Sequence, residues 1–272
     1  MTAPAERAAR FLALHQSHTP LLMPNAWDAG SAKLLASLGF EALATTSSGF
    51  AATLGRLDGS ITREEALLHS AQLSAAVDVP VSADLENCFA DDPAGVAATV
   101  TLAAATGLAG CSVEDFTGDR SNPIYDAALA VDRVAAAVEA AHAGPVRLVL
   151  TARAEGLLHG QGDLDAIIAR LQSFEAAGAD ALFAPGLNDA DSIRAVVSAV
   201  KRPVNVLALP GGPTVAELRE LGVARVSFGG ALLWTALGAV VEAAREVLEH
   251  GTFGYHDLSA TGRAPARTAF GG

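Results

Sequence analysis

Short apolar runs alternate along this chain with longer alanine-rich stretches that have the pattern of helices. Eight short runs are typical of strands: 21–25, 41–47, 80–86, 110–115, 147–155, 181–186, 203–209 and 225–230. Strands that alternate with helices favour a parallel sheet. In 272 residues, eight such units predict one α/β domain over residues 1–250, a (β/α)8 barrel of the TIM type. An open doubly wound sheet is the alternative, but no GxGxxG or Walker A loop supports it.

Several helix boundaries carry sequence signals of their own. Thr62 with Glu65, and Thr214 with Glu217, have the spacing of capping boxes, and each pair precedes an apolar periodic run. Residues 251–272 are small and contain Arg, Gly and Ala, so we expect a loosely packed C-terminal tail there.

Charged residues occupy the ends of three successive predicted strands, where the flanking sequence is apolar. They are Asp84 and Glu86, Glu114 and Asp115, and Arg153 and Glu155. An unpaired buried charge is costly, so a metal, a substrate or paired counter-charges must offset it. Residues i and i+2 of a strand share a face, which predicts a common direction within the first and third pairs. On neighbouring parallel strands, about 4.8 Å apart, these groups converge on one site, which points to an enzyme rather than a scaffold.

The acidic residues in this pattern predict a magnesium site. Mg²⁺ prefers oxygen ligands and usually keeps several waters, with one or two carboxylates engaged. Asp84, Glu86 and Glu114 are the candidate ligands, and Asp58 can support them from the loop after the second strand. The alternative is that these acids cap loops and form surface salt bridges.

Two further features near the strand ends suggest a place for an anionic substrate. Arg153 can bind a carboxylate through its forked guanidinium, although it can instead form a structural pair with Glu155 or Glu114. The turn at 45–50 (TTSSGF) offers a hydroxyl and backbone N–H groups to a carboxylate or phosphate, or is an ordinary turn. His159 is a weaker candidate acid or base near the mouth, and its alternative is an incidental position.

Other segments are candidates for lining or covering the site. The polar loop at 116–126 follows Glu114 directly, so it is a candidate lid. Asn205 and Ser227, on late strands, are candidate lining residues. The PGGPT segment at 210–214 resembles a phosphate-binding barrel loop, but its capping threonine is a sufficient structural reason for it.

Composition narrows the function classes. A net charge of −12 argues against nucleic-acid or anionic-membrane surfaces, while a local cation and an arginine still permit an anionic substrate. Cys88 and Cys111 lack metal-type spacing, and we expect both to be buried without a disulfide. The N-terminal sequence lacks a signal-peptide core and no apolar run reaches the length of a membrane span, so we expect a cytoplasmic protein.

Taken together, these residues resemble the isocitrate lyase/phosphoenolpyruvate mutase superfamily over nearly the whole chain. The matching positions are Ser48, Gly49 and Phe50 for its oxyanion turn, Asp58 for its loop aspartate, Asp84 and Glu86 for its D-x-D metal motif, Glu114 for its E-D motif, and Arg153 for its substrate arginine. The resemblance implies a barrel, a C-terminal helix exchanged between subunits, and a homodimer or homotetramer.

For chemistry, the resemblance implies Mg²⁺, with Mn²⁺ as a substitute, binding a 2-oxo acid such as oxaloacetate, pyruvate or 2-oxoglutarate. The reaction would pass through an enolate and would most simply cleave a carbon–carbon bond, as in a lyase or decarboxylase. Cleavage or transfer at a phosphorus–carbon bond is the alternative, and a non-catalytic 2-oxo acid binding protein is another.

Departures from the family's motifs limit the reaction. The family's lyases carry a loop cysteine that acts as acid and base, but residues 116–126 contain none. Arg120 and Asn122 match only part of the mutase lid, and Pro123 stands where that lid has serine. The glycines of the metal motif are absent from residues 84–89. We therefore predict that isocitrate and methylisocitrate are not its substrates.

Overall fold

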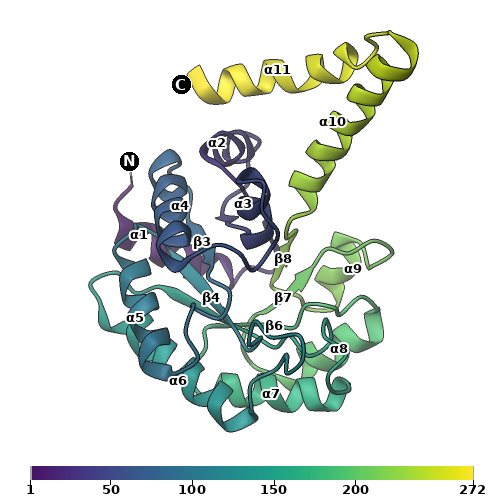
Figure 1. Cartoon of the computed structure of the whole chain (residues 1–272). Coiled ribbons are helices and arrows are strands. Elements are labelled where there is room, and N and C mark those ends of the chain that lie inside the picture. Colours follow the sequence, from purple (N-terminus) through teal and green to yellow (C-terminus); the bar gives the residue numbers. More distant parts are fainter. Residues whose placement is uncertain (1, 272) are drawn as a thin grey trace.

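The computed structural model describes residues 2–271, and its centre is a barrel of parallel strands (Figure 1). Over these residues eight strands form one sheet in the order β1-β8-β7-β6-β5-β4-β3-β2. They are β1 (Leu21–Met23), β2 (Leu43–Ala44), β3 (Val81–Asp84), β4 (Gly110–Glu114), β5 (Val149–Arg153), β6 (Ala181–Phe183), β7 (Val204–Leu207) and β8 (Arg225–Ser227). A parallel bridge between Asn25 and Ala44 joins the two ends of the sheet. The prediction of a TIM-type barrel is confirmed, and the open sheet is excluded.

Helices surround the strands and alternate with them. They are α1 (Pro4–Leu14), α2 (Ala29–Ser37), α3 (Ser47–Thr53), α4 (Arg63–Ala76), α5 (Pro93–Ala104), α6 (Ala127–Ala143), α7 (Leu164–Ala176), α8 (Ala190–Ala199), α9 (Val215–Glu220), α10 (Ala231–His250) and α11 (His256–Gly271). Both predicted capping boxes are present, since Thr62 and Glu65 bond reciprocally, as do Thr214 and Glu217. These caps stop two helices from fraying where they leave the carboxyl ends of their strands.

Much of the inside of the barrel is polar, unlike the branched apolar layers that usually fill such barrels, although Phe11 of α1 forms a smaller apolar cluster with strand residues such as Leu21 and Val149. Arg225 of β8 donates from Nη2 to Thr151 Oγ1 of β5 at 3.0 Å, and these strands are not neighbours in the sheet. The bond must therefore cross the barrel interior. Ser82, Asn205 and Ser227 are also buried strand residues. The main apolar core lies instead between the strands and the helices around them, with residues such as Leu150 and Ile193 fully buried.

The C-terminal helices form an arm that projects from the barrel (Figure 1). Helix α10 leads away from β8, and α11 turns back to pack against α2. Residues 251–272 were expected to be a tail, but residues 256–271 are helical, with Pro265 inside the helix. No described residue of α11 is buried within one chain. Over residues 2–271, no helix is long and apolar enough to cross a membrane.

Candidate active site

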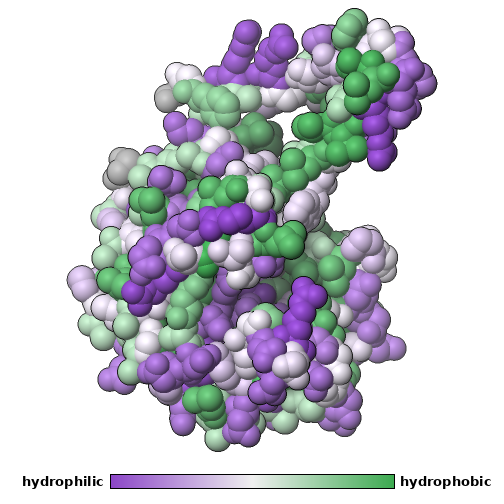
Figure 2. All heavy atoms as spheres, viewed as in Figure 1, coloured by the Kyte–Doolittle hydropathy of each residue, from purple (hydrophilic) through white to green (hydrophobic). Residues whose placement is uncertain are grey.

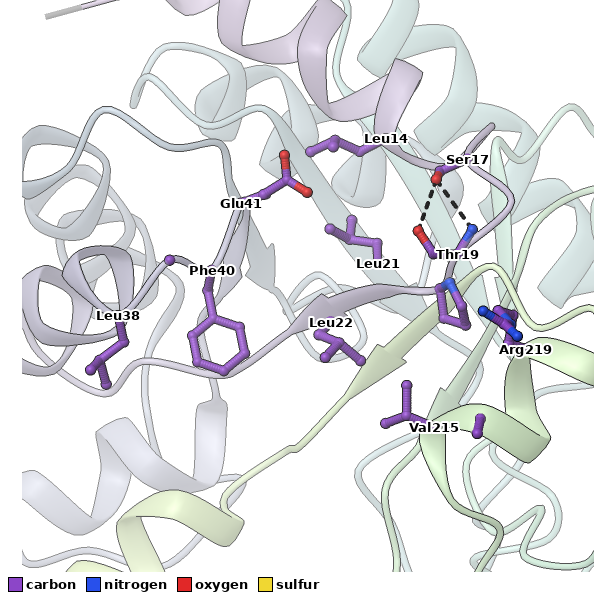
Figure 3. Close-up of a pocket in the computed structure, with 13 residues that line it drawn as sticks. Leu14, Ser17, Thr19, Leu21, Leu22, Leu38, Phe40, Glu41, Val215 and Arg219 are labelled. Carbon is purple, nitrogen blue, oxygen red and sulfur yellow. Dashed lines mark hydrogen bonds between the residues drawn. The ribbon is translucent and has the colours of Figure 1, made fainter.

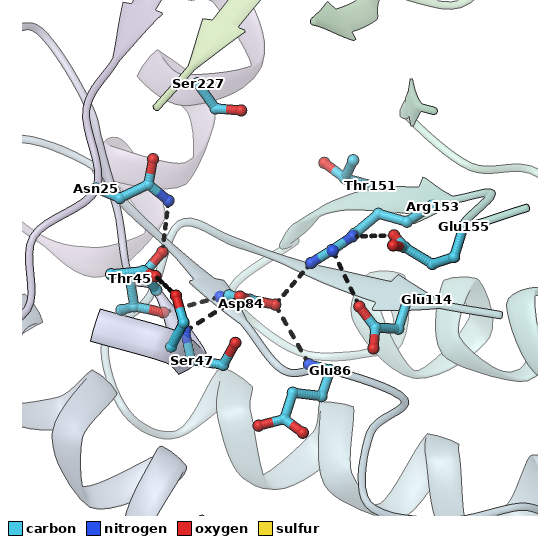
Figure 4. A network of polar contacts seen from close by, with 12 residues as sticks. Asn25, Thr45, Ser47, Asp84, Glu86, Glu114, Thr151, Arg153, Glu155 and Ser227 are labelled. Carbon is cyan, nitrogen blue, oxygen red and sulfur yellow. Dashed lines mark hydrogen bonds and ion pairs between the residues drawn. The ribbon is translucent and has the colours of Figure 1, made fainter. Parts of the chain in front are cut away.

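The charged strand ends meet at the mouth of the barrel, around one arginine (Figure 4). Arg153 Nη1 lies 2.8 Å from Asp84 Oδ1, Nη2 lies 3.0 Å from Glu114 Oε2, and Nε lies 2.7 Å from Glu155 Oε1. Burial alone would lower the pKa of Arg153, but the charges of these three carboxylates outweigh it and raise the pKa well above its ordinary value. The structure therefore shows both pairs that the sequence left open, with Glu155 and with Glu114, and adds Asp84.

Strand alternation does not explain where Glu86 points. β3 ends at Asp84, and Glu86 has a φ of 50°. Glu86 therefore lies beyond the strand, and the alternation that predicted a common direction for the two side chains does not apply to it. In Figure 4 the Glu86 side chain leaves in a different direction from Asp84. Glu86 Oε1 is buried without a hydrogen-bond partner among the described residues. Burial first, and then Asp84 and Asp58, raise the pKa of Glu86 to about 8.

Asp115 belongs to a different environment from Glu114. Its carboxylate accepts a hydrogen bond from the backbone N–H of Glu155 at 2.8 Å and lies 3.1 Å from Arg170 Nη1 of α7. Burial raises the pKa of Asp115 to about 6. These two contacts direct Asp115 toward α7, so this acid serves the packing of that helix and not the mouth.

The loop after β3 is held in a strained conformation. Besides Glu86, Cys88 and Phe89 have positive φ values of 59° and 56°, and these residues are not glycine. The left-handed region costs such residues about 1–2 kcal/mol each. Buried Arg133 of α6 holds the loop by donating to the carbonyl oxygens of Asn87, Ala90 and Asp91. Cys88 lies where the resemblance expects glycine, so the chain keeps a glycine-type backbone without the glycine.

The turn after β2 is the start of a helix rather than an open cradle. Thr46 caps α3 by accepting the Gly49 N–H at 3.2 Å, and the Phe50 N–H bonds to the Thr46 carbonyl at 2.9 Å. Both N–H groups expected to bind an oxyanion are therefore used within the helix. The Ser47 N–H instead donates to Asp84 Oδ2 at 3.2 Å, and the Ser48 hydroxyl lies 3.1 Å from Thr46 Oγ1.

A cavity of about 160 Å³ opens among these groups inside the mouth. Its lining includes Ser48, Asp58, Asp84 and Arg153, which the sequence singled out, and the expected lining residues Asn205 and Ser227. Gly49, Phe50, Glu86, Glu114, Arg120 and Asn122 are not part of that lining. Phe50 stacks on the ring of His69 at 3.9 Å, and Arg120 and Asn122 are exposed on their loop.

Some residues of this cavity escaped the sequence analysis. Asn25 donates to the Thr45 carbonyl at 2.7 Å and accepts the Phe228 N–H at 3.0 Å, and so joins β1 to the neighbouring strand ends. Thr45 Oγ1 accepts the Asp84 N–H at 2.8 Å. Asn25 is neutral, so the pattern of charged strand ends does not mark it, whereas Thr45 belongs to the turn at 45–50 that the sequence singled out. Arg225 also lines the cavity, and it stands at the beginning of its strand rather than at the end.

The candidate lid is a compact loop at the edge of the mouth. Phe116 pairs with Ile124 in an antiparallel bridge, and the Thr117 N–H donates to the Pro123 carbonyl at 2.8 Å. The ring of Phe116 stacks on His159 with centroids 4.2 Å apart. Tyr125 donates its hydroxyl proton to Asp91, and burial together with this carboxylate raises the pKa of Tyr125 to about 12. Tyr125 is therefore held as a structural donor.

The fit of a divalent cation depends on how many protein ligands it needs. Within residues 2–271, no three His, Cys, Asp or Glu side chains stand together as a ready metal site. Mg²⁺, however, is commonly held by one or two carboxylates and several waters. Asp84 on the cavity wall meets that smaller requirement by itself. Glu86 lies outside the lining of the cavity, but its buried, unpartnered Oε1 makes it the candidate second ligand. Asp84 and Glu114 would each have to exchange a pairing with Arg153 to take part.

Known proteins share both the sequence pattern and the barrel. A protein of Burkholderia cenocepacia J2315 described as a lyase/mutase is 52% identical, with a TM-score of 0.93 over 97% of this chain and 95% of its own. Oxaloacetate decarboxylase of Pseudomonas fluorescens is 29% identical over 86% of this chain and 82% of its own length. A Corynebacterium glutamicum protein assigned as 2-methylisocitrate lyase 2 is 27% identical over 92% and 83%.

A family description matches most of the chain. The phosphoenolpyruvate phosphomutase family aligns with residues 11–248, which span all the strands of the barrel and nearly all of α10. The match includes every residue described at the mouth. The chain therefore belongs to the phosphoenolpyruvate phosphomutase family, within the isocitrate lyase/phosphoenolpyruvate mutase superfamily.

Proposed function

We propose that this chain is a Mg²⁺-dependent enzyme that cleaves a carbon–carbon bond of a small 2-oxo or 2-hydroxy carboxylate, as a lyase or decarboxylase. The observation that carries the proposal is one small cavity, about 160 Å³, that has both Asp84 and Arg153 on its wall. The carboxylate of Asp84 can bind a cation and the guanidinium of Arg153 can bind an anion. The two together suit a 2-oxo acid that chelates the cation. The similarity of the chain to an oxaloacetate decarboxylase supports a small 2-oxo acid as the substrate.

In this proposal Asp84 and Glu86 hold the cation, with Glu114 recruited from its pair with Arg153 and with Mn²⁺ as a substitute metal. When bound, the cation supplies Lewis-acid polarisation of the 2-oxo oxygen and charge neutralisation. With Asp84 and Glu114 turned from Arg153 toward the cation, Arg153 is released to orient the substrate carboxylate. The Ser48 hydroxyl donates toward the oxygen that gains charge as the enolate forms. Since the N–H groups of Gly49 and Phe50 are used in α3, Ser48 is the main protein donor on that side.

Asp58 faces the same cavity from the loop after α3 and is the proposed partner for proton movement there. Closure of loop 116–126 would bring Arg120 and Asn122 toward the substrate and exclude water. In the structure both residues are exposed, so this part of the proposal requires the loop to move.

Steady-state turnover tests the proposal. Purified protein with Mg²⁺ should convert oxaloacetate to pyruvate and CO2, and a chelator should stop it. Isocitrate and methylisocitrate should turn over poorly, because loop 116–126 offers no cysteine to reprotonate the enolate and general acid catalysis contributes about 10²- to 10⁴-fold. Isocitrate cleavage at about 1 s⁻¹ or faster would contradict this substrate assignment. No turnover of any 2-oxo acid, with binding retained, would favour the non-catalytic binding protein.

Phosphorus–carbon chemistry is the second candidate, because the matching family is described as phosphoenolpyruvate phosphomutase. The same cation site and Arg153 would serve a phosphonate in place of a carboxylate. Phosphorus NMR of phosphonopyruvate with the enzyme and Mg²⁺ separates the two candidates. Loss of the phosphonate resonance at a rate above oxaloacetate turnover would favour this chemistry.

The C-terminal arm supports a homodimer or homotetramer in which helices are exchanged. Since α10 leaves the barrel, a groove of about 700 Å³ remains beside β1, lined by apolar residues that include Leu22, Phe40 and Val215 (Figure 3). Figure 2 shows apolar surface along α10, where Leu237 and Val240 are 40% and 63% exposed. We propose that α10 of a second copy covers this apolar surface. Light scattering should show an oligomer that Val240→Asp dissociates, while Leu102→Asp on α5 leaves it intact; a monomeric wild type would contradict the exchange.

A further inference from the structure

The floor of the cavity holds a second buried arginine in surroundings unlike those of Arg153. Arg225 is 3% exposed and donates to Asn205 Oδ1 at 2.9 Å, Thr151 Oγ1 at 3.0 Å and His15 Nε2 at 3.0 Å. Burial, and then the charge of Arg225, lower the pKa of His15 to about 3, so this histidine is neutral. No carboxylate within residues 2–271 forms an ion pair with Arg225.

Arg225 remains charged despite this environment. Burial, and then the positive charge of Arg153, lower its pKa to about 9, which is still above neutral pH. A buried cation that bonds only to neutral groups has lost its hydration without gaining a counter-charge. It attracts an anion wherever the cavity lets one approach.

Neutral partners alone do not mark an anion site, because two other buried arginines of the chain also bond to neutral groups. Arg7 donates to the carbonyls of Ser74 and Val77, at the end of α4, where the helix dipole supplies negative charge. Arg133 donates to loop carbonyls and lies 4.0 Å over the ring of Tyr125. Neither lines the mouth cavity, whereas Arg225 does. Arg225 therefore combines a buried charge with neutral side-chain partners and access to the ligand space.

The two arginines are anchored at nearby positions of one strand. Thr151, which accepts from Arg225, lies two residues before Arg153 on β5. Two residues of a strand span about 7 Å. The two positions on β5 are therefore within reach of a four-carbon dicarboxylate with one terminal hydrogen bond. Hydroxyl and amide groups of Ser82, Ser112 and Asn205 line the cavity between mouth and floor, so the path is polar.

We propose that Arg225, with Asn205 and Ser227, forms an anion subsite at the cavity floor that binds the second carboxylate of a short dicarboxylate substrate. This inference rests on the proposed function, since the first carboxylate is held at the mouth. It selects four-carbon dicarboxylates over monocarboxylates such as pyruvate. Arg153 does not supply this second contact, because it is assigned to the first carboxylate and also pairs with Glu155.

Malate and lactate form a suitable pair of probes, because both are 2-hydroxy acids and differ in the second carboxylate. Calorimetry in the presence of Mg²⁺ should show malate binding to wild type about 10- to 100-fold more tightly than lactate, the range for hydrogen bonds to a charged group. Arg225→Met should remove this preference by weakening malate and should leave lactate affinity within about twofold of wild type.

Asn205→Asp provides a second test that does not depend on whether Arg225→Met folds. It keeps the side-chain shape and places a carboxylate beside Arg225 Nε, which now bonds to Asn205 Oδ1 at 2.9 Å. This internal counter-charge should also remove the preference for malate. Retention of the preference in either folded variant would overturn the subsite. Equal binding of malate and lactate to wild type would overturn it and leave the proposed function standing, whereas binding of neither would overturn both.

Discussion

The mouth and the floor of the barrel each hold a buried arginine, and the two differ in their partners. Arg153 at the mouth is surrounded by Asp84, Glu114 and Glu155, while Arg225 at the floor bonds to neutral groups. The pKa of Arg153 is raised by its carboxylates, and that of Arg225 is lowered by burial to about 9. The comparison teaches that the ability of an arginine near a ligand cavity to bind an anion depends on the ion pairs that it already forms.

Removal of each arginine should have unequal effects on stability. Arg153→Met leaves buried carboxylates without a counter-charge and should cost about 3–5 kcal/mol. Arg225→Met leaves neutral groups without a donor and should cost about 1–2 kcal/mol. Urea unfolding measures both, with Arg194→Met as the control, since its ion pair with Asp191 is exposed and worth about 0–1 kcal/mol. Equal losses at the two buried sites would mean that the charge environments do not differ in energy.

The mouth, and not the floor, should bind the metal. Asp84→Asn should weaken Mg²⁺ by more than about 100-fold, because even partners outside the ligand shell are commonly worth 10- to 100-fold. Calorimetry with Mg²⁺ alone measures this, and Asp119→Asn, on the exposed part of the lid, should change little. Unchanged Mg²⁺ affinity in Asp84→Asn would remove the metal assignment from the mouth.

Much of this architecture was open to prediction from the sequence. The barrel followed from eight apolar runs, and the convergence of Asp84, Glu114 and Arg153 followed from their places at strand ends. Alternation failed at Glu86 because β3 stops at Asp84 and the chain turns into the left-handed region. Local pattern cannot show such a turn when glycine is absent.

Other features depended on contacts between distant parts of the chain. Arg225 bonds to His15, 210 residues earlier, and to Thr151 across the barrel, so nothing in its neighbourhood of sequence marks it. The expected cradle of Gly49 and Phe50 was lost because Thr46 starts a helix there. The C-terminal segment is helical, although its small residues and Pro265 argue for a tail.

Backbone strain should also be confined to the mouth. Cys88 has a φ of 59°, so Cys88→Gly should be more stable than Cys88→Ala by about 1 kcal/mol. At Cys111, within β4, the order should reverse, because glycine weakens a strand by about 0.5–1 kcal/mol relative to alanine. Thermal unfolding of the four variants decides this. If alanine were the more stable replacement at both positions, the loop after β3 would not be strained.

The smallest expected effect concerns the loop over the mouth. Amide hydrogen exchange in residues 116–126 should slow when Mg²⁺ and malate are added, because closure would shield the exposed backbone there. Helix α11 provides an internal control and should not change. If the loop is already as protected as the strands in the empty protein, it is not a lid.

A crystal structure with Mn²⁺ and malate tests the central claim most directly, because the anomalous signal locates the cation independently of the ligand. The account predicts an anomalous peak within coordination distance of Asp84. It predicts malate in the same cavity, with one carboxylate at the mouth and the other beside Arg225. A cation and malate bound away from this cavity, in crystals whose mouth is open to solvent, would contradict the account.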